Sequence, residues 1–241
     1  GVSIGVATFP DAGSGAADIA RRTDIALHRA KAAGRHAARL FEPHMQDEAD
    51  TRLELERGLR LALQRDELAL YFQPQVDAHG RLAGAEALLR WHNPTLGMLP
   101  PDRFVHIAEE TGLIHALGQW VVDAACRQLR EWKQSGLTDG IRLAVNVSPW
   151  QIAQPKFADA IAAQVRTAGV EPGELTLELT ESVLLDDFDA ARQTLQRLSD
   201  LGFRLSLDDF GTGYSSLARL QQLPLHELKI DRSFVHALQP D

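Results

Sequence analysis

The chain has 241 residues, 44% of them hydrophobic and 24% charged, which is ordinary for a soluble globular protein and enough for one large domain or two small ones. Its formal net charge is −8 and no basic run is present, so the composition excludes non-specific nucleic-acid binding. A single cysteine excludes an internal disulfide, and no apolar run approaches the roughly 20 residues that span a bilayer.

The chain opens with a predicted strand over residues 1–9, turn residues at 11–15 and a helix over 17–36. One strand and one helix cannot form a domain, and the chain lacks an initiator methionine, so we expect a piece of a longer protein. A charged stretch from 42 to 68 carries leucines near helical spacing, which predicts a connector helix. A coiled-coil partner role is the alternative, but fewer than three heptads are present.

Strands and helices alternate from Ala69 onward, which predicts an α/β fold with a mainly parallel sheet covered by helices. The predicted strands are 69–77, 81–91, 143–148, 175–181, 205–211 and 227–231. The sequence separation between successive later strands is about the length of one strand-helix unit in a (β/α)8 barrel of the TIM type. Six strands are visible, where a closed barrel needs eight.

Four of these strands each carry one polar residue on the face opposite their leucines and valines. These residues are Asn146, Glu178, Asp208 and Lys229. On an earlier strand, Glu86 and Arg90 are predicted to lie on the same face as each other. Such side chains are costly to bury on apolar strands unless they neutralise one another or hold a cation. Parallel strands of a barrel bring them together at one mouth.

Carboxylate and amide oxygens favour Mg²⁺ or Mn²⁺ over zinc. Asp209, beside Asp208, could reach a second ion. Two ions would clamp a phosphodiester and acidify an attacking water. Lys229 would hold that water or a phosphate oxygen, and Arg90 the other phosphate.

Plainer interpretations exist for the same residues. Glu86 with Arg90, or Asp208 with Lys229, could be simple buried ion pairs. Asp208 and Asp209 could merely end a strand, since aspartate is common at the start of a turn. Cys126 lies in an amphipathic run, where a buried thiol is expected rather than a nucleophile.

The segments VSIGVATFP and RRTDIALHRAKAAGRHAARLF resemble the C-terminal end of a GGDEF domain, the family that makes cyclic di-GMP. The resemblance implies a GGDEF remnant over 1–41 and a linker over 42–50. The family's nucleotide-binding loop is absent from these residues, which excludes cyclase activity for this chain alone. An upstream sensory domain is also expected.

Residues 51–241 resemble an EAL domain, the phosphodiesterase family that opens cyclic di-GMP to linear pGpG. The motifs YFQPQV, EALLRW, FVHIAEETGLI, NVSPWQ, ELTES, DDFGTGYSSL and LKIDRSFV occur in order. The resemblance implies these metal ligands: Glu86, Asn146, Glu178, Asp208 and Asp209. It implies that Lys229 assists the catalytic water, that Gln73 and Arg90 contact the dinucleotide, and that Glu181 supports the loop over 210–217. It also implies two ions and a homodimer.

The family places a further glutamate and a glutamine on a seventh and an eighth strand, which these residues do not include. We therefore expect the 241 residues alone to be poorly stable and inactive. An inactive receptor for cyclic di-GMP is the alternative function, and an unrelated Mg²⁺-dependent barrel enzyme is a third. We expect a cytoplasmic location, although segments outside these residues could anchor a parent protein to a membrane.

Overall fold

The structure is a computed structural model that describes residues 1–8, 15–32, 34, 36–137, 140–184, 187–211 and 217–236. The turn predicted at 11–15 falls outside these residues, except for its last position. The strands are β1 (Ile4–Val6), β2 (Ala38–Leu40), β3 (Leu68–Val76), β4 (Leu82–Asn93), β5 (Gly97–Leu99), β6 (Arg142–Asn146), β7 (Leu175–Thr180), β8 (Arg204–Phe210) and β9 (Glu227–Ile230).

The α-helices are α1 (Ala16–Ala32), α2 (Pro43–Ala62), α3 (Val105–Thr111), α4 (Ile114–Gln134), α5 (Pro149–Ile152), α6 (Phe157–Thr167), α7 (Phe188–Asp200), α8 (Leu217–Leu220) and α9 (Arg232–His236). Three 3₁₀ helices join them: η1 (Pro101–Arg103), η2 (Pro172–Glu174) and η3 (Glu181–Leu184). No helix in the described part of the chain is both long enough and apolar enough to cross a membrane. The chain divides into two compact units, Gly1–Gly58 and Leu59–Asp241.

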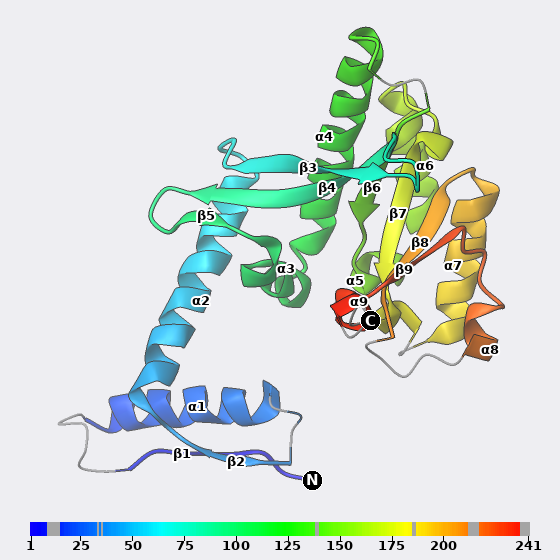
Figure 1. Ribbon diagram of the computed structural model, residues 1–241. Coiled ribbons are helices and arrows are strands. Elements are labelled where there is room, and N and C mark those ends of the chain that lie inside the picture. The colour runs from blue at the N-terminus through cyan, green and yellow to red at the C-terminus, as the bar shows by residue number, and fades with distance from the viewer. Residues whose placement is uncertain are drawn as a thin grey trace. The chain divides into compact units, whose positions relative to one another are not determined.

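The first unit packs α1 on a two-stranded parallel sheet of β1 and β2 (Figure 1). Ala26 and Ala30 of α1 are fully buried. Gly5 lets the helix approach closely, because a Cβ at this position would lie 2.2 Å from the carbonyl oxygen of Thr23. Apolar side chains on the strands remain exposed, among them Ile4 at 50% and Leu40 at 51%. Parallel sheets are normally covered on both faces, so this sheet has an apolar surface that no described residue covers.

The second unit is built on a sheet with the strand order β3-β4-β6-β7-β8-β9, and β5 pairs with β4 at the side. The neighbours β3 and β4 are antiparallel, whereas the pairs from β4–β6 to β8–β9 are parallel. Helices connect the parallel strands, so the prediction of an α/β fold with about six main strands is confirmed. The arrangement is consistent with a TIM-type barrel.

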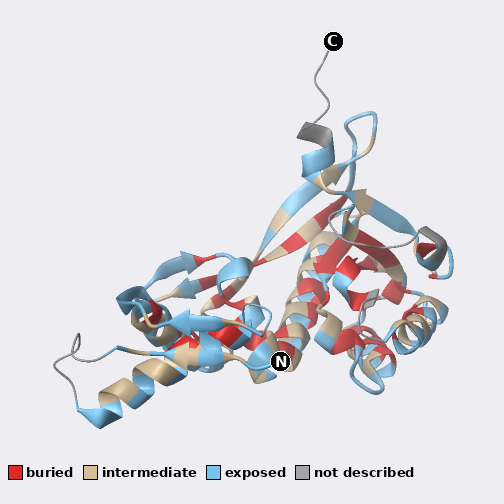
Figure 2. Ribbon diagram, turned by 90° about the horizontal axis from the view of Figure 1, so that it is seen from below, coloured by how far each residue is buried: buried red, intermediate tan, exposed pale blue. Residues whose placement is uncertain are grey.

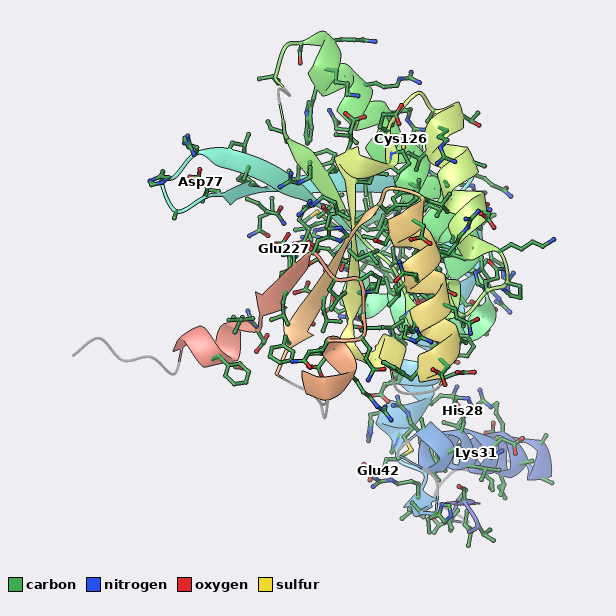
Figure 3. The ribbon with its side chains drawn as sticks, turned by 90° about the vertical axis from the view of Figure 1, so that its right-hand side faces the viewer. His28, Lys31, Glu42, Asp77, Cys126 and Glu227 are labelled. Atoms are coloured by element: carbon green, nitrogen blue, oxygen red, sulfur yellow. The ribbon has the colours of Figure 1, made fainter. Side chains whose placement is uncertain are left out.

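Helices α4, α6 and α7 cover one face of this sheet (Figure 1). The leucines and valines of β6, β7 and β8 that were predicted for that face are buried in the core, as the central strands show in Figure 2, whereas Leu228 of β9 is 40% exposed. Cys126 of α4 is fully buried in the same core (Figure 3), and burial raises the pKa of its thiol to about 11. The prediction of a buried thiol is therefore confirmed, and the raised pKa disfavours the reactive thiolate.

Local signals in the sequence explain where several elements begin and end. Asp187 caps α7 by accepting a hydrogen bond from the backbone nitrogen of Ala190, and Gly202 follows this helix with a φ of +99°. At the tip of the β3–β4 hairpin, Asp77 accepts hydrogen bonds from the backbone nitrogens of His79 and Arg81 (Figure 3). These caps and turns agree with the expected roles of aspartate and glycine.

Leu177 lies in β7 with no exposed surface, so truncating it tests the core. We expect L177A to lower the free energy of unfolding by about 2–5 kcal/mol, because it removes buried methyl groups and leaves a cavity. L137A is the matched control, since Leu137 is 63% exposed and its loss should change the free energy by less than about 0.5 kcal/mol. Urea denaturation measures both, and equal midpoints for the two variants would contradict the packing.

Candidate metal centre

The polar residues predicted on the parallel strands lie on the sheet face that the helices leave uncovered. Glu86 is on β4, Asn146 ends β6, Glu178 is on β7, Asp208 is on β8 and Lys229 is on β9. The register pairs Asn146 with Glu178, and Thr180 with Asp208. One carboxylate oxygen each from Glu86, Glu178 and Asp208 lie within 4.8 Å of one another. The structure therefore brings these carboxylates together from three strands.

Lys229 lies among the three carboxylates. Its Nζ is 2.9 Å from Glu86 Oε2, 2.5 Å from Glu178 Oε1 and 3.5 Å from Asp208 Oδ2. The simple ion pair of Asp208 with Lys229 is therefore one part of a four-residue cluster. The alternative pair of Glu86 with Arg90 is not among the ion pairs of the described residues. Arg90 Nη1 instead donates to the carbonyl oxygen of Leu89.

Burial and the contacts with Lys229 act in opposite directions on the charged groups of this cluster. The side chain of Glu178 is 1% exposed, and burial raises the pKa of its carboxyl to about 7, although the hydrogen bond from Lys229 opposes the shift. Burial by itself would lower the pKa of Lys229, but its contacts with Glu178 and then Glu86 raise it above the usual value. The ammonium of Lys229 thus stays charged and neutralises part of the cluster.

Asn146 extends the cluster on the side of β6. Its Nδ2 donates to Glu86 Oε1 at 3.0 Å. Amide nitrogen and oxygen exchange places by a rotation of the side chain, so the same residue can direct its oxygen toward a cation. Asn146 is thereby in contact with a carboxylate of the cluster, as the strand phase predicted.

The residues present fit a divalent cation. Three carboxylates against one ammonium leave a formal excess of two negative charges in a partly buried site. Glu178 Oε2 is buried and has no hydrogen-bond partner among the described residues, so an acceptor oxygen is available. An all-oxygen donor set of this kind suits Mg²⁺ or Mn²⁺.

Asp209 is placed differently from the other predicted ligands. It lies at an irregularity in the pairing of β8 with β9, between Leu207 and Phe210, and its φ is +53°. Its side chain is exposed and does not belong to the group of three carboxylates. Burial, followed by the neighbouring charge of Asp208, raises the pKa of its carboxyl. The left-handed backbone turns Asp209 away from the regular alternation of the strand.

Gln73 and Arg90 lie on the β3–β4 hairpin beside Glu86. Gln73 is the register partner of Glu86 across the antiparallel pair, and its side chain is exposed. The guanidinium carbon of Arg90 lies 5.8 Å from the ring centroid of Tyr71. Arg90 therefore comes from the strand that carries Glu86, and Gln73 comes from its antiparallel neighbour.

Glu181 is the first residue of η3 and is buried. Its Oε1 accepts a hydrogen bond of 3.0 Å from the backbone nitrogen of Gly211, directly after β8. Residues 212–216 of the loop that Glu181 was predicted to support lie outside the described residues. Its role in that loop stays a prediction.

Ser206 was missed in the sequence, although it shares a strand phase with Asp208. It is fully buried on β8 and is the register partner of Glu178. The same alternation that selected Asp208 would have selected it, but a serine carries no charge that marks it as costly to bury.

A cavity of about 320 Å³ between α4 and α6 is lined by His115, Gln151, Phe157 and others, and by none of the predicted site residues.

Comparison with known proteins identifies relatives of this chain. The family described as EAL domain matches residues 56–241. The chain is 43% identical over 240 residues to the bifunctional diguanylate cyclase/cyclic di-GMP phosphodiesterase MucR of Pseudomonas aeruginosa, covering 99% of this chain and 35% of that protein. It is 41% identical over 234 residues to the cyclic di-GMP phosphodiesterase NbdA of the same organism, covering 97% and 30%.

A solved structure of the PaMucR phosphodiesterase in complex with c-di-GMP superimposes with a TM-score of 0.73. It is 46% identical and covers 78% of this chain and 76% of that chain. The chain spans about a third of the length of the curated relatives it matches.

Proposed function

Because the chain belongs to the EAL domain family, we propose that the intact protein hydrolyses cyclic di-GMP to linear pGpG with divalent metal ions, as part of bacterial second-messenger signalling. The observation that carries this proposal is the group of Glu86, Glu178 and Asp208 around Lys229 on one sheet face. The names of the relatives MucR and NbdA, and the c-di-GMP complex of PaMucR, support it.

The proposed ligands of two Mg²⁺ or Mn²⁺ ions are Glu86, Asn146, Glu178, Asp208 and Asp209. When bound, such ions polarise the phosphoryl oxygens and lower the pKa of a water molecule. Glu178 and Asp208 would supply carboxylate oxygens from the adjacent parallel strands β7 and β8. The backbone pairing of these strands fixes the positions from which the two side chains extend. For Asp209 to act as a ligand, its exposed side chain has to turn toward the cluster.

Lys229, Gln73 and Arg90 are proposed to act on the substrate. The ammonium of Lys229 carries a positive charge beside the carboxylates, where it can hold a water molecule or a phosphate oxygen. Arg90 can form paired hydrogen bonds with the second phosphate, and Gln73 can bond the dinucleotide from the neighbouring strand. Glu181 is proposed to keep the segment after β8 in position through Gly211.

The proposed function also implies how the chain is divided into domains. We propose that residues 1–41 belong to a GGDEF domain, 42–50 form a linker and 51–241 belong to the EAL domain. The exposed apolar side chains of Ile4, Val6 and Leu40 support a larger first domain that covers this sheet. In the second unit, the outer edges of β3 and β9 pair with no described strand, and Ile230 is 62% exposed. Two further strands that close the barrel would pair with these edges.

We also propose a homodimer through the EAL domain, control by an upstream sensory domain and a cytoplasmic site of action. The family resemblance supports these proposals. Size-exclusion chromatography with light scattering tests the dimer directly, since a monomer at working concentration would contradict it.

Hydrolysis is tested with the intact protein and cyclic di-GMP, with pGpG measured by ion-exchange chromatography. We expect pGpG in the presence of Mg²⁺ or Mn²⁺ and a loss of at least about 100-fold in rate with EDTA, because the carboxylates alone cannot activate water at neutral pH. Added metal should restore the rate. Binding of cyclic di-GMP without release of pGpG in saturating metal would contradict the hydrolase and favour the receptor.

A further inference from the structure

The side chain of Arg90 is held at two points on the β3–β4 hairpin. Its Nη1 donates a hydrogen bond of 2.8 Å to the carbonyl oxygen of Leu89. Its guanidinium carbon lies over the ring of Tyr71, 5.8 Å from the ring centroid. A cation over an aromatic face is attracted by the negative charge density of the ring. A backbone acceptor and an aromatic face therefore both act on the guanidinium of Arg90.

The strand pairing explains why the carbonyl oxygen of Leu89 is available. The backbone nitrogen of His92 donates to the carbonyl oxygen of Glu67, directly before β3. Because hydrogen-bonded residues alternate along an antiparallel pair, the carbonyl of Leu89 points away from β3. On that other side, β6 pairs with β4 up to Ala87 and β5 begins to pair at Trp91, so Leu89 lies between the two. Its carbonyl can thus accept a side-chain hydrogen bond without breaking a strand pair.

The ring of Tyr71 reaches Arg90 along one face of the hairpin. Ala69 is the register partner of Arg90, Leu88 is that of Tyr71, and side chains of such partners share a face. Ala69 carries only a methyl group, so no longer side chain separates the ring from Arg90. The ring centroid of Tyr71 is also 6.1 Å from that of His92. Tyr71 therefore extends from its place opposite Leu88 toward the end of β4, and it remains 46% exposed.

These contacts leave one edge of the guanidinium for a ligand. With the residues that the structure describes, Arg90 makes no hydrogen bond or ion pair other than the one through Nη1. Its Nε and Nη2 form a fork of two N–H groups, which matches two oxygens of a phosphate. Arg90 and Glu86 lie on the same face of β4, so this fork belongs to the face that carries the metal centre.

We propose that Tyr71 is a positioning residue that holds the guanidinium of Arg90 so that its Nε–Nη2 edge faces a phosphate of cyclic di-GMP. The inference rests on the proposed function, and it adds a residue to those predicted for the site. An arginine side chain has several rotatable bonds, and fixing it in its bound orientation reduces the entropy lost on binding. Only the aromatic face is required, so the hydroxyl of Tyr71 is dispensable.

The first test is calorimetric titration of cyclic di-GMP into the intact protein in EDTA, where no hydrolysis is expected. Y71L keeps an apolar side chain but has no aromatic face, and it should bind about fivefold more weakly than the wild type. Y71F should stay within about twofold, because its ring is retained. In the hydrolysis assay with saturating Mn²⁺, Y71L should raise KM about fivefold and leave kcat within about twofold, since the phosphate contact is made equally in the ground and transition states.

A double-mutant cycle with R90M assigns the effect to Arg90. In the R90M background, Y71L should change the affinity by less than about twofold, because the cation is gone. V76A is the matched control: Val76 lies on the same strand and is 62% exposed, so its affinity should stay within about twofold of the wild type. Urea unfolding checks that each variant is folded.

The inference and the proposed function fail in different ways. Equal affinity for Y71L and the wild type, or an equal loss in Y71F, in V76A or in the R90M background, would overturn the role of Tyr71. If R90M binds too weakly to measure, the comparison of Y71L with Y71F still decides. Wild-type protein that binds cyclic di-GMP but releases no pGpG in saturating Mn²⁺ would overturn the proposed hydrolysis alone. Wild-type protein that binds no cyclic di-GMP would overturn both.

Discussion

Replacing Glu86 by alanine is expected to abolish hydrolysis of cyclic di-GMP and its dependence on metal together. E86A removes one of the three carboxylates of the cluster and the acceptor for both Lys229 and Asn146. We expect the rate at saturating substrate to fall by at least about 1000-fold, since charge stabilisation at a metal contributes several kcal/mol to a transition state. The rate of pGpG release, measured over a range of Mn²⁺ concentrations, checks this.

E131A serves as the control for E86A, because Glu131 is an exposed glutamate on α4. Its activity and metal dependence should match those of the wild type. E86A should still unfold cooperatively, which separates a lost site from a lost fold. Full activity in a folded E86A protein would rule out the metal centre as described.

Replacing Lys229 by methionine has the second largest expected effect, and its sign depends on metal. K229M keeps the aliphatic chain but leaves Glu86, Glu178 and Asp208 without their ammonium. Removing one partner of a buried ionic cluster typically costs about 3–5 kcal/mol of stability. We expect this loss in EDTA and a partial recovery with Mg²⁺, since a divalent cation supplies the missing positive charge. Hydrolysis should remain low with metal, because the group proposed to hold water or phosphate is gone.

Urea unfolding with and without Mg²⁺ measures the stability of K229M. K133M is the control: Lys133 pairs with Glu174, but its side chain is 40% exposed. Exposed pairs contribute about 0–1 kcal/mol, so K133M should differ little from the wild type and should not respond to metal. The same midpoint for K229M and the wild type in EDTA would show that the lysine does not neutralise the cluster.

The longer elements of the fold were predictable because their periodicity is strong. α7 has Asp187 as its cap, buried leucines at 195 and 198, and Gly202 after its end. The short strands β2 and β5, of three residues each, were not predicted, because three residues cannot establish an alternation. They form by pairing with β1 and β4.

Strand phase also selected the residues of the candidate site, but it does not describe the end of β8 or the exposed face of β9. Asp209 breaks the alternation, because a local irregularity and a positive φ are set by tertiary contacts rather than by propensity. Leu228 and Ile230 have the phase of core residues, yet they are 40% and 62% exposed. Whether such a face is covered depends on neighbouring elements that the strand itself does not encode.

The sequence by itself determined the alternation of strands and helices, the family and the list of polar side chains at one strand phase, because these are properties of local order along the chain. Only the tertiary structure decided that Lys229 contacts three carboxylates and that Ser206 lies beside Glu178. Those contacts join strands that are far apart in sequence, as Glu86 and Lys229 are. Their distances depend on strand order and register, which the packing of the whole sheet determines.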